Sequence, residues 1–164
     1  MAPDHPPTEL DPHRIFETLA RHEVDFVLVG GLAAQTHGSP RMTNDVDLIP
    51  RPEPDNLARL AEALRALEAR VLNPGEEDME IDASMLPRAT IWQFATRHGD
   101  VDVLHEAPGA APYDQLRKRA LVVSVGEVRL PVAGRDDLIR MKLARGRPVD
   151  RADVAALTDP EVEP

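Results

Sequence analysis

The segment from residue 27 to residue 49 constrains the fold more than any other part of the chain. An apolar run over residues 26–29 predicts a strand buried on both faces, and two glycines follow it at once. Gly30 and Gly31 carry no Cβ, so they allow a sharp turn and the close approach of a ligand. Residues 32–37 are expected to form a short helix whose first N–H groups point back over this turn, which suits a phosphate.

A second predicted strand ends this segment and carries two carboxylates. Asp45 and Asp47 alternate with Val46 and Leu48, so both acids leave the same face of the strand. Neighbouring carboxylates repel each other and are costly unless a cation or a proton lies between them. Their oxygens suit Mg²⁺ or Mn²⁺ bridging to a phosphate; the alternative is a strand face that is simply solvated. The glycine pair one strand earlier favours a phosphate–metal site.

The glycine pair and the two acids together resemble a family signature. Gly30-Gly31, thirteen intervening residues and Asp45-Val46-Asp47 are similar to the signature of the nucleotidyltransferase superfamily, the DNA polymerase β-like fold. The fuller pattern resembles the branch that contains the AbiEii-type and MenT-type toxins of toxin–antitoxin pairs. It comprises Gly30, Gly31, Leu32, Ala33, His37, Gly38, Arg41, Thr43, Asp45, Asp47 and Leu48. The resemblance implies an α/β (α+β) fold: a small mixed β-sheet with helices packed mainly on one face.

Asp102 is the only charge in the apolar run 101–104, which we expect to be a strand. Either it faces water from a half-exposed strand, or it is a buried acid with a partner. The superfamily that the chain resembles places its third acid on a strand beside the first pair, and the residues around Asp102 are similar to the toxin-like branch. The predicted metal ligands are therefore Asp45, Asp47 and Asp102, and Asp102 is alternatively a general base.

Two helices are expected near the end of the chain. Asp136 is expected to cap a helix over residues 137–145, and Asp150 to cap the last helix. The inward residues are expected to be Leu138, Ile139 and Leu143 in the first of these helices and Val154 and Leu157 in the second. Lys142 lies on or beside the first apolar face, so its ammonium either extends to solvent or reaches a phosphate in a cleft.

The resemblance extends to this region and implies a nucleotide site. Lys142, Arg147, Asp150 and Asp153 are similar to the C-terminal motif of the toxin-like branch, in which the lysine is a phosphate ligand and the last acid belongs to the active-site region. The predicted catalytic residues are Asp45, Asp47, Asp102 and Lys142, and the predicted nucleotide-binding residues are Gly30, Gly31, Ser39, Arg41, Thr43, Lys142 and Asp153. Thr43 either contacts phosphate or caps its turn. His37 is expected to be structural.

The remaining patterns predict how the sheet is built and covered. Helices are expected over residues 12–21, from residue 54 to residue 67 and from residue 112, strands over 90–96, 101–104, 121–125 and 127–132, and a solvated acidic loop over 76–82. Residues 121–132 are expected to form a hairpin at the sheet edge. The expected organisation is a loose segment over residues 1–10, one domain over 11–158 and a tail over 159–164.

Charge and composition limit the partners. The net charge of −10 argues against broad non-specific binding of nucleic acid, but residues 129–151 hold seven bases against three acids. That excess is either a set of solvated helix faces or a surface for RNA. The chain has no cysteine, no apolar stretch of membrane-spanning length and a polar start, so we expect no disulfide, no signal peptide and no membrane contact, and a cytoplasmic location.

Three functions are compatible with these features. The first is a toxin-like enzyme that uses Mg²⁺ or Mn²⁺ to move a nucleoside monophosphate from an NTP to a hydroxyl of RNA, such as a tRNA end, or of a protein, with an antitoxin as its partner. The second is a small-molecule nucleotidyltransferase of the aminoglycoside-modifying type, because an acidic protein suits a cationic acceptor. The third is a catalytically silent module that binds a nucleotide or a protein.

Overall fold

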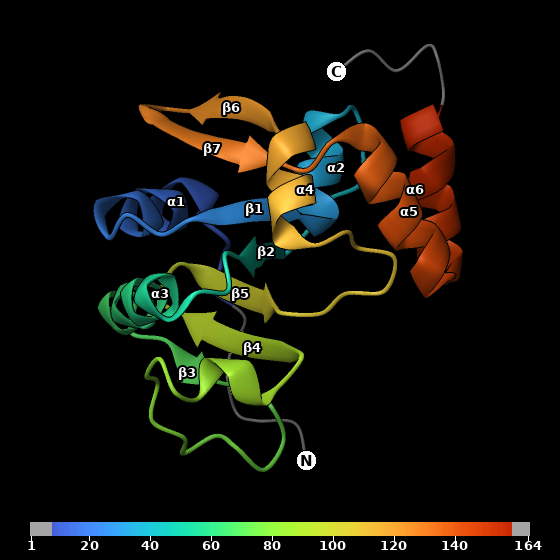
Figure 1. The fold of residues 1–164 in the computed structure, drawn as a ribbon. Helices are drawn as coiled ribbons and strands as arrows, with labels where there is room; N and C mark the ends of the chain where they lie inside the picture. Colours follow the sequence, from blue (N-terminus) through green and yellow to red (C-terminus); the bar gives the residue numbers. More distant parts are fainter. Residues whose placement is uncertain (1–7, 159–164) are drawn as a thin grey trace.

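The computed structural model describes residues 8–158 as a mixed sheet with six helices (Figure 1). In chain order the elements are α1 (Pro12–Arg21), β1 (Phe26–Val29), α2 (Gly30–Thr36), β2 (Asp45–Pro50), α3 (Pro54–Ala66), β3 (Arg70–Val71), a 3₁₀ turn η1 (Leu86–Arg88), β4 (Ile91–Thr96), β5 (Gly99–Leu104), α4 (Tyr113–Arg119), β6 (Leu121–Val125), β7 (Val128–Val132), α5 (Arg135–Arg145) and α6 (Pro148–Thr158). The predicted fold class is confirmed. Most of the predicted loose segment 1–10 and all of the tail 159–164 lie outside the described residues.

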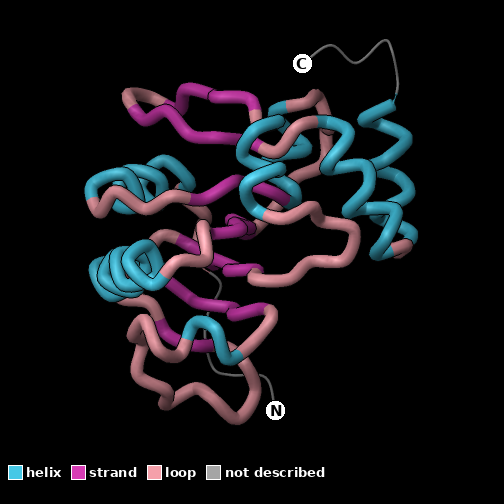
Figure 2. The backbone as a smooth tube through the Cα atoms, in the orientation of Figure 1, coloured by secondary structure: helices cyan, strands magenta, loops and turns pink. Residues whose placement is uncertain are grey.

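The seven strands form one sheet in the order β3-β4-β5-β2-β1-β7-β6, and Figure 2 shows them stacked in this order. Two pairs are parallel, β1 with β7 and β2 with β5, and the other pairs are antiparallel. Both parallel pairs join strands that are distant in the sequence. This mixed topology places β1 and β2, the strands of the glycine–acid segment, at the centre of the sheet.

Adjacent rows of the sheet point to opposite faces. One row runs across four strands through Leu28, Leu48, Val103 and Trp92, all fully buried. The Phe16 ring of α1 stacks on Phe26, with ring centroids 6.4 Å apart, so α1 covers this apolar face. Helix α3 packs beside α1, and Figure 1 shows the two helices side by side. The core therefore lies between these helices and the sheet.

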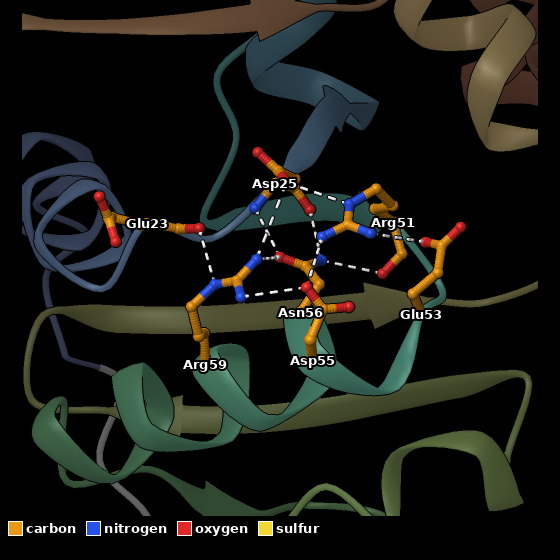
Figure 3. A network of polar contacts seen from close by, with 7 residues as sticks. All are labelled: Glu23, Asp25, Arg51, Glu53, Asp55, Asn56 and Arg59. Atoms are coloured by element: carbon orange, nitrogen blue, oxygen red, sulfur yellow. Dashed lines mark hydrogen bonds and ion pairs between the residues drawn. The ribbon is translucent and has the colours of Figure 1, made fainter.

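A polar network joins β1, β2 and α3 at the end of the strands remote from the glycines (Figure 3). The fully buried Asn56 side chain donates to the backbone carbonyls of Asp25 and Arg51, both at 2.8 Å, and its oxygen accepts from the Asp25 N–H. The Arg51 guanidinium contacts the carboxylates of Asp25, Glu53 and Asp55 at 3.0–3.1 Å. These contacts fix where α3 begins relative to the two central strands.

Three predicted helix boundaries are wrong. Helix α2 begins at Gly30 itself, whose φ of +72° turns the chain directly from the strand into the helix. Helix α5 begins at Arg135 with Gly134 at its N-cap, so Asp136 does not cap it. Helix α6 begins at Pro148, which places Asp150 in its first turn. Proline at the first position of a helix needs no N–H partner, which explains the earlier start of α6.

The predicted inner face of α5 is also partly wrong. Leu143 is 58% exposed, whereas Met141 and Lys142 are buried beside Leu138. Residues three and four positions after Leu138 share its face of the helix, but the fifth does not. The buried stripe of α5 therefore contains a lysine. Within residues 8–158, no helix combines the length and the apolar character needed to cross a membrane.

Candidate active site

Three carboxylates meet on the face of the sheet that α1 and α3 do not cover. The row next to the apolar one runs through Val29, Asp47, Asp102 and Gln93 on β1, β2, β5 and β4. Asp45 leaves β2 on the same side as Asp47, because the two residues are two positions apart. Asp45, Asp47 and Asp102 each offer a carboxylate oxygen, and these oxygens all lie within 4.8 Å of one another. The acids predicted as metal ligands are therefore brought together.

The electrostatics of this cluster show how crowded the charges are. Burial raises the pKa of Asp47 to about 6, and the nearby Asp45 charge adds to the increase. Burial also raises the pKa of Asp102 to about 8, with further contributions from Asp47 and Asp45. Hydrogen bonding between the two carboxyl groups acts to lower the pKa of Asp47 and to raise the pKa of Asp102. Without a cation, the raised pKa values favour a bound proton, which reduces the repulsion between the carboxylates.

The two glycines leave room for the acids and for the loop before β2. A Cβ on Gly30 would overlap with the Asp47 carboxylate, and a Cβ on Gly31 would lie 2.7 Å from the Thr43 hydroxyl oxygen. The Thr43 hydroxyl donates to Asp45 at 3.3 Å. Glycine is thus required at both positions by protein atoms, and Gly30 also borders the open cleft. Thr43 orients one of the acids.

Lys142 lies across from the acids and is held by two buried aspartates of α6. Its Nζ is 2.8 Å from an Asp153 oxygen and 4.0 Å from an Asp150 oxygen, and the residue is 6% exposed. Arg41 donates two hydrogen bonds to Asp153, both 2.9 Å long, and the Arg147 guanidinium donates two to Asp150, 2.7 and 3.1 Å long. Two carboxylates and three cations therefore form one network between α5, α6 and the loop before β2.

The pKa values of these aspartates are low because of their partners. Hydrogen bonds from Arg147 hold the pKa of Asp150 below its usual value, against the effect of burial. Burial acts to raise the pKa of Asp153, but hydrogen bonds from Arg41 and Lys142 outweigh it, and the pKa is lowered. Both groups are therefore charged at neutral pH, and they keep their cationic partners in fixed positions.

A cleft of about 300 Å³ separates the acids from α5. Gly30, Asp47, Asp102 and Lys142 line its polar part. Its apolar wall is formed by Ile91, Leu104, Ala107, Pro108, Leu138 and Met141. This volume is at the lower end for small-molecule sites, and a mainly apolar wall with a few convergent polar groups is typical of them.

Four further polar residues line this cleft and were not predicted from the sequence: Thr90, Gln93, Glu106 and Arg145. Gln93 lies beside Asp102 in the strand register, and the positive charge of Arg145 acts on Asp47. Arg145 could have been found from the sequence, because it follows Lys142 by three positions on the same helix. Nothing in the local sequence of Gln93 or Glu106 distinguishes them.

The other predicted site residues lie outside the cleft lining. Ser39 is buried and does not line the cleft. Arg41 and Asp153 belong to the ionic network described above, and Thr43 binds Asp45. His37 is buried, and its Nε2 lies 2.9 Å from the Ala133 carbonyl oxygen, a structural contact as expected.

Ion pairs neutralise three of the seven bases at residues 129–151. Asp137 pairs with Arg140 and also with Arg119, and the pairs of Lys142 and Arg147 have been described. Among the described residues, four bases of this segment form no ion pair: Arg129, Arg135, Arg145 and Arg151. The positive surface available to an RNA is therefore smaller than the sequence count suggests.

Solved structures share this fold at low sequence identity. A lincosamide antibiotic adenylyltransferase, LnuA, bound to lincomycin, has a TM-score of 0.64 at 10% identity, covering 93% of this chain and 98% of that one. ANT(2")-Ia in complex with adenylyl-2"-tobramycin has a TM-score of 0.57 at 13% identity, covering 89% and 84%. An antigenic nucleotidyltransferase-like protein from Paracoccidioides brasiliensis has a TM-score of 0.54 at 16% identity, covering 88% and 72%.

The family match extends over most of the chain. No curated protein matches it. Residues 13–158 match the family described as nucleotidyltransferase of unknown function (DUF6036), a span that contains the glycine pair, all three clustered acids and the network of Lys142. Together with the shared fold, this match shows that the chain belongs to the DUF6036 family of nucleotidyltransferases.

Proposed function

We propose that the chain is a metal-dependent enzyme that transfers a nucleoside monophosphate from an NTP to an acceptor hydroxyl and releases pyrophosphate. The observation that supports this most directly is the cluster of Asp45, Asp47 and Asp102. Three acids from adjacent strands share one small volume, and none of the described lysines or arginines forms an ion pair with them. Uncompensated hard oxygen ligands at this spacing fit a divalent cation such as Mg²⁺ or Mn²⁺.

The chain's own residues have distinct tasks in this proposal. Asp45, Asp47 and Asp102 would hold the cation, which when bound supplies charge stabilisation at the reacting phosphoryl group and a lowered pKa at the acceptor hydroxyl. Lys142 and Arg145, on the opposite wall, would offset the charge of the departing pyrophosphate. Because burial raises the pKa of Asp102, binding of the cation would be coupled to loss of a proton from this group. No covalent intermediate with the protein is required.

A small-molecule acceptor is the better-supported of the candidate substrates. The cleft has a volume of about 300 Å³ and a mainly apolar wall, and three of the seven bases at residues 129–151 are neutralised by ion pairs. Two proteins of the same fold are a lincosamide and an aminoglycoside adenylyltransferase. We therefore propose a hydroxyl-bearing small molecule as acceptor, with a positive charge that complements the acidic chain.

RNA or protein modification, the activity of the toxin-like branch, is the second candidate. Arg145 supports it, because this cation lines the cleft and forms no ion pair among the described residues. A tRNA end could then reach the acids along α5. An antitoxin partner belongs to this candidate alone. Because both candidates consume NTPs, which are cytoplasmic metabolites, we propose a cytoplasmic location in either case.

Nucleotide transfer with competing acceptors tests both candidates at once. The protein is incubated with each α-labelled NTP and Mg²⁺ or Mn²⁺, and separately with aminoglycosides, lincosamides, total RNA and a protein extract. Asp45→Ala and the exposed-loop variant Asp78→Ala are run beside the native chain. We expect label on a small molecule, lost with Asp45→Ala and kept with Asp78→Ala.

Other results have defined meanings. Label on RNA or protein would replace the first candidate by the second. An increase of the melting temperature by NTP and metal without any transfer would indicate a silent binding module. If NTP and metal neither raise the melting temperature nor yield a labelled product, the metal-dependent reaction is the wrong proposal.

A further inference from the structure

The two edges of the sheet differ in a way that points to an interaction surface. One edge is β3, which has only two residues, and short edge strands resist pairing with other chains. The other edge is β6, Leu-Val-Val-Ser-Val, which contains no charge and no proline. Natural proteins usually protect an edge strand of this kind with lysine, proline or a bulge. Strand β6 has no such protection and projects at the top of the sheet in Figure 1.

The register of the β6–β7 hairpin identifies the free backbone groups of this edge. The turn has two residues, Gly126 and Glu127, so the closing pair Val125 and Val128 is hydrogen bonded. Hydrogen-bonded and non-hydrogen-bonded pairs then alternate, which leaves Ser124–Arg129 and Val122–Pro131 non-hydrogen-bonded. Pro131 has no N–H and agrees with this assignment. The N–H and C=O groups of Val122 and Ser124 therefore point away from β7, towards the free edge.

The side chains of the same strand are unusually exposed for apolar residues. Leu121 is 52% exposed and Val122 is 49% exposed, and they are the only adjacent pair among the large exposed hydrophobic residues that the structure describes. Their side chains point to opposite faces of the sheet. An added strand would thus cover apolar surface on both faces as well as pair the free backbone groups.

We propose that β6 pairs with β6 of a second copy of this chain, antiparallel, about a two-fold axis at Val123. In this register Val122 faces Ser124 of the partner subunit, and their outward N–H and C=O groups form a hydrogen-bonded pair on each side of the axis. Val123 faces its own counterpart in a non-hydrogen-bonded pair. The two sheets join into one continuous sheet through an isologous contact.

Charge complementarity favours the second copy as the occupant. Strand β6 follows the basic last turn of α4 and leads into the exposed Glu127. In that turn Arg119 pairs with Asp137, whereas Arg117 and Lys118 form no ion pair among the described residues. An antiparallel arrangement brings the basic end of each β6 to the acidic end of the other. A parallel arrangement would place the two basic turns together. The active-site acids on β2 and β5 lie beyond β7 and β1 from this edge, so both clefts stay open.

Sedimentation velocity over a range of concentrations provides the first test. A single paired strand is a small contact, so we expect a concentration-dependent monomer–dimer equilibrium rather than a permanent dimer. Val122→Lys places a charge at the edge and is expected to weaken dimerisation at least about tenfold. Leu143→Lys, the same type of change at an exposed residue of α5, is expected to have no effect. A native chain that stays monomeric at every concentration would overturn the proposal.

Cysteine cross-linking tests the register, since the chain contains no cysteine of its own. In a non-hydrogen-bonded antiparallel pair the Cα atoms are about 4.5 Å apart, within the range of a disulfide. Val123→Cys should form a disulfide dimer on mild oxidation, whereas Leu121→Cys or Val125→Cys alone should not, and a mixture of these two should. Circular dichroism confirms that each variant is folded. Equal cross-linking of all three single variants, or none with Val123→Cys, would contradict the proposed axis.

Discussion

At the residue scale, the crowded carboxylates of Asp45, Asp47 and Asp102 would serve the proposed transfer reaction, but their mutual repulsion lowers the stability of the folded chain without metal. Replacing Asp102 by Asn removes one proposed metal ligand but also one of the like charges, while the side-chain volume is conserved. We expect Asp102→Asn to lower nucleotide transfer at least about 100-fold. Without metal at pH 8, we expect it to raise the free energy of unfolding by about 1 kcal/mol. Labelled transfer and thermal melting measure the two effects.

Asp114→Asn is the control for this variant, because Asp114 is exposed on α4. It should leave transfer unchanged and lower stability only slightly, because Asp114 lies in the first turn of α4, where the helix dipole favours a carboxylate. A lower melting temperature for Asp102→Asn than for the native chain would contradict the charge-crowding argument.

The raised pKa values of Asp47 and Asp102 also predict how stability depends on pH. Their folded-state pKa values, about 6 and about 8, exceed the ordinary carboxyl value, so the folded chain binds protons more tightly than the unfolded chain. This contribution is fully present below about pH 4 and is lost as the pH rises through 6 and then 8. We expect the metal-free protein to lose on the order of 5 kcal/mol between about pH 5 and pH 8.5 from these groups.

Thermal melting in the presence of a chelator measures this loss, and Asp102→Asn should reduce it. Because protons compete with the cation for the same oxygens, the stabilisation by added Mn²⁺ should increase with pH. Stabilisation that is equal at pH 6 and pH 8 would show that Mn²⁺ binds elsewhere.

The sequence predicted the three clustered acids, but for two different reasons. Side chains alternate between the two faces of a strand, so Asp45 and Asp47 were predicted to share one face from the local sequence alone. Asp102 joins them only because β5 pairs with β2 in parallel, across more than fifty residues of chain, and no local pattern encodes that register. There the family resemblance supplied what the residues alone could not. Gln93 was missed for the same reason, since its place beside Asp102 also depends on strand register.

At the scale of elements, helices α5 and α6 are joined by buried charge rather than by a wide apolar face. Replacing Lys142 by Met leaves Asp153 with Arg41 alone, and we expect a loss of about 2–3 kcal/mol. Adding Asp153→Asn should restore part of this loss, because the unpaired charge is then removed as well. Denaturant unfolding of the native chain, the two single variants and the double variant provides a double-mutant cycle.

Lys118→Met, an exposed lysine of α4, is the matched control and should cost less than about 0.5 kcal/mol. If the two single effects at Lys142 and Asp153 simply add, the two side chains are not energetically coupled.

Helix α3 ends in a strained residue that offers a different kind of test. Glu68 follows its C-cap with a φ of +56°, in the left-handed region that favours glycine. We expect Glu68→Gly to stabilise the protein by about 0.5–1 kcal/mol. Glu62→Gly, an exposed position inside the same helix, should destabilise it by about 1 kcal/mol. Equal losses for both variants, measured by thermal melting, would show that the strain is absent.

Element boundaries were predictable where side chains mark them and not where the backbone alone does. Asp11 accepts from the Arg14 N–H and Pro12 opens α1, as the sequence indicated. Helix α5 has the backbone of Gly134 at its N-cap, and Asp137, which could have been mistaken for part of a cap, instead binds Arg119 from α4. Such long-range partners depend on the folded arrangement of the chain.

For the whole molecule, the candidate active-site cleft is assembled from both ends of the described chain. The acids come from the central strands β2 and β5, and the cations facing them come from α5, near the end of the chain. Patterns of hydrophobicity predicted strands and helices, and the family resemblance implied a mixed sheet, but neither predicted the order of its strands. That order depends on two parallel pairings that connect distant segments. The apolar wall of the cleft likewise exists only once β4, β5 and α5 have come together.

The ionic attachment of α6 has a consequence for the motions of the native state. Its buried residues are Asp150, Asp153 and Leu157, and it contacts the rest of the protein chiefly through α5. With so little apolar surface holding it, α6 should detach in a local opening that leaves the sheet intact. We expect its backbone amides to exchange with deuterium faster than those of β2 and β5, and at a rate that denaturant scarcely changes. Such an opening would release Lys142 from its two acid partners and expose the cation side of the cleft in a protein that remains folded.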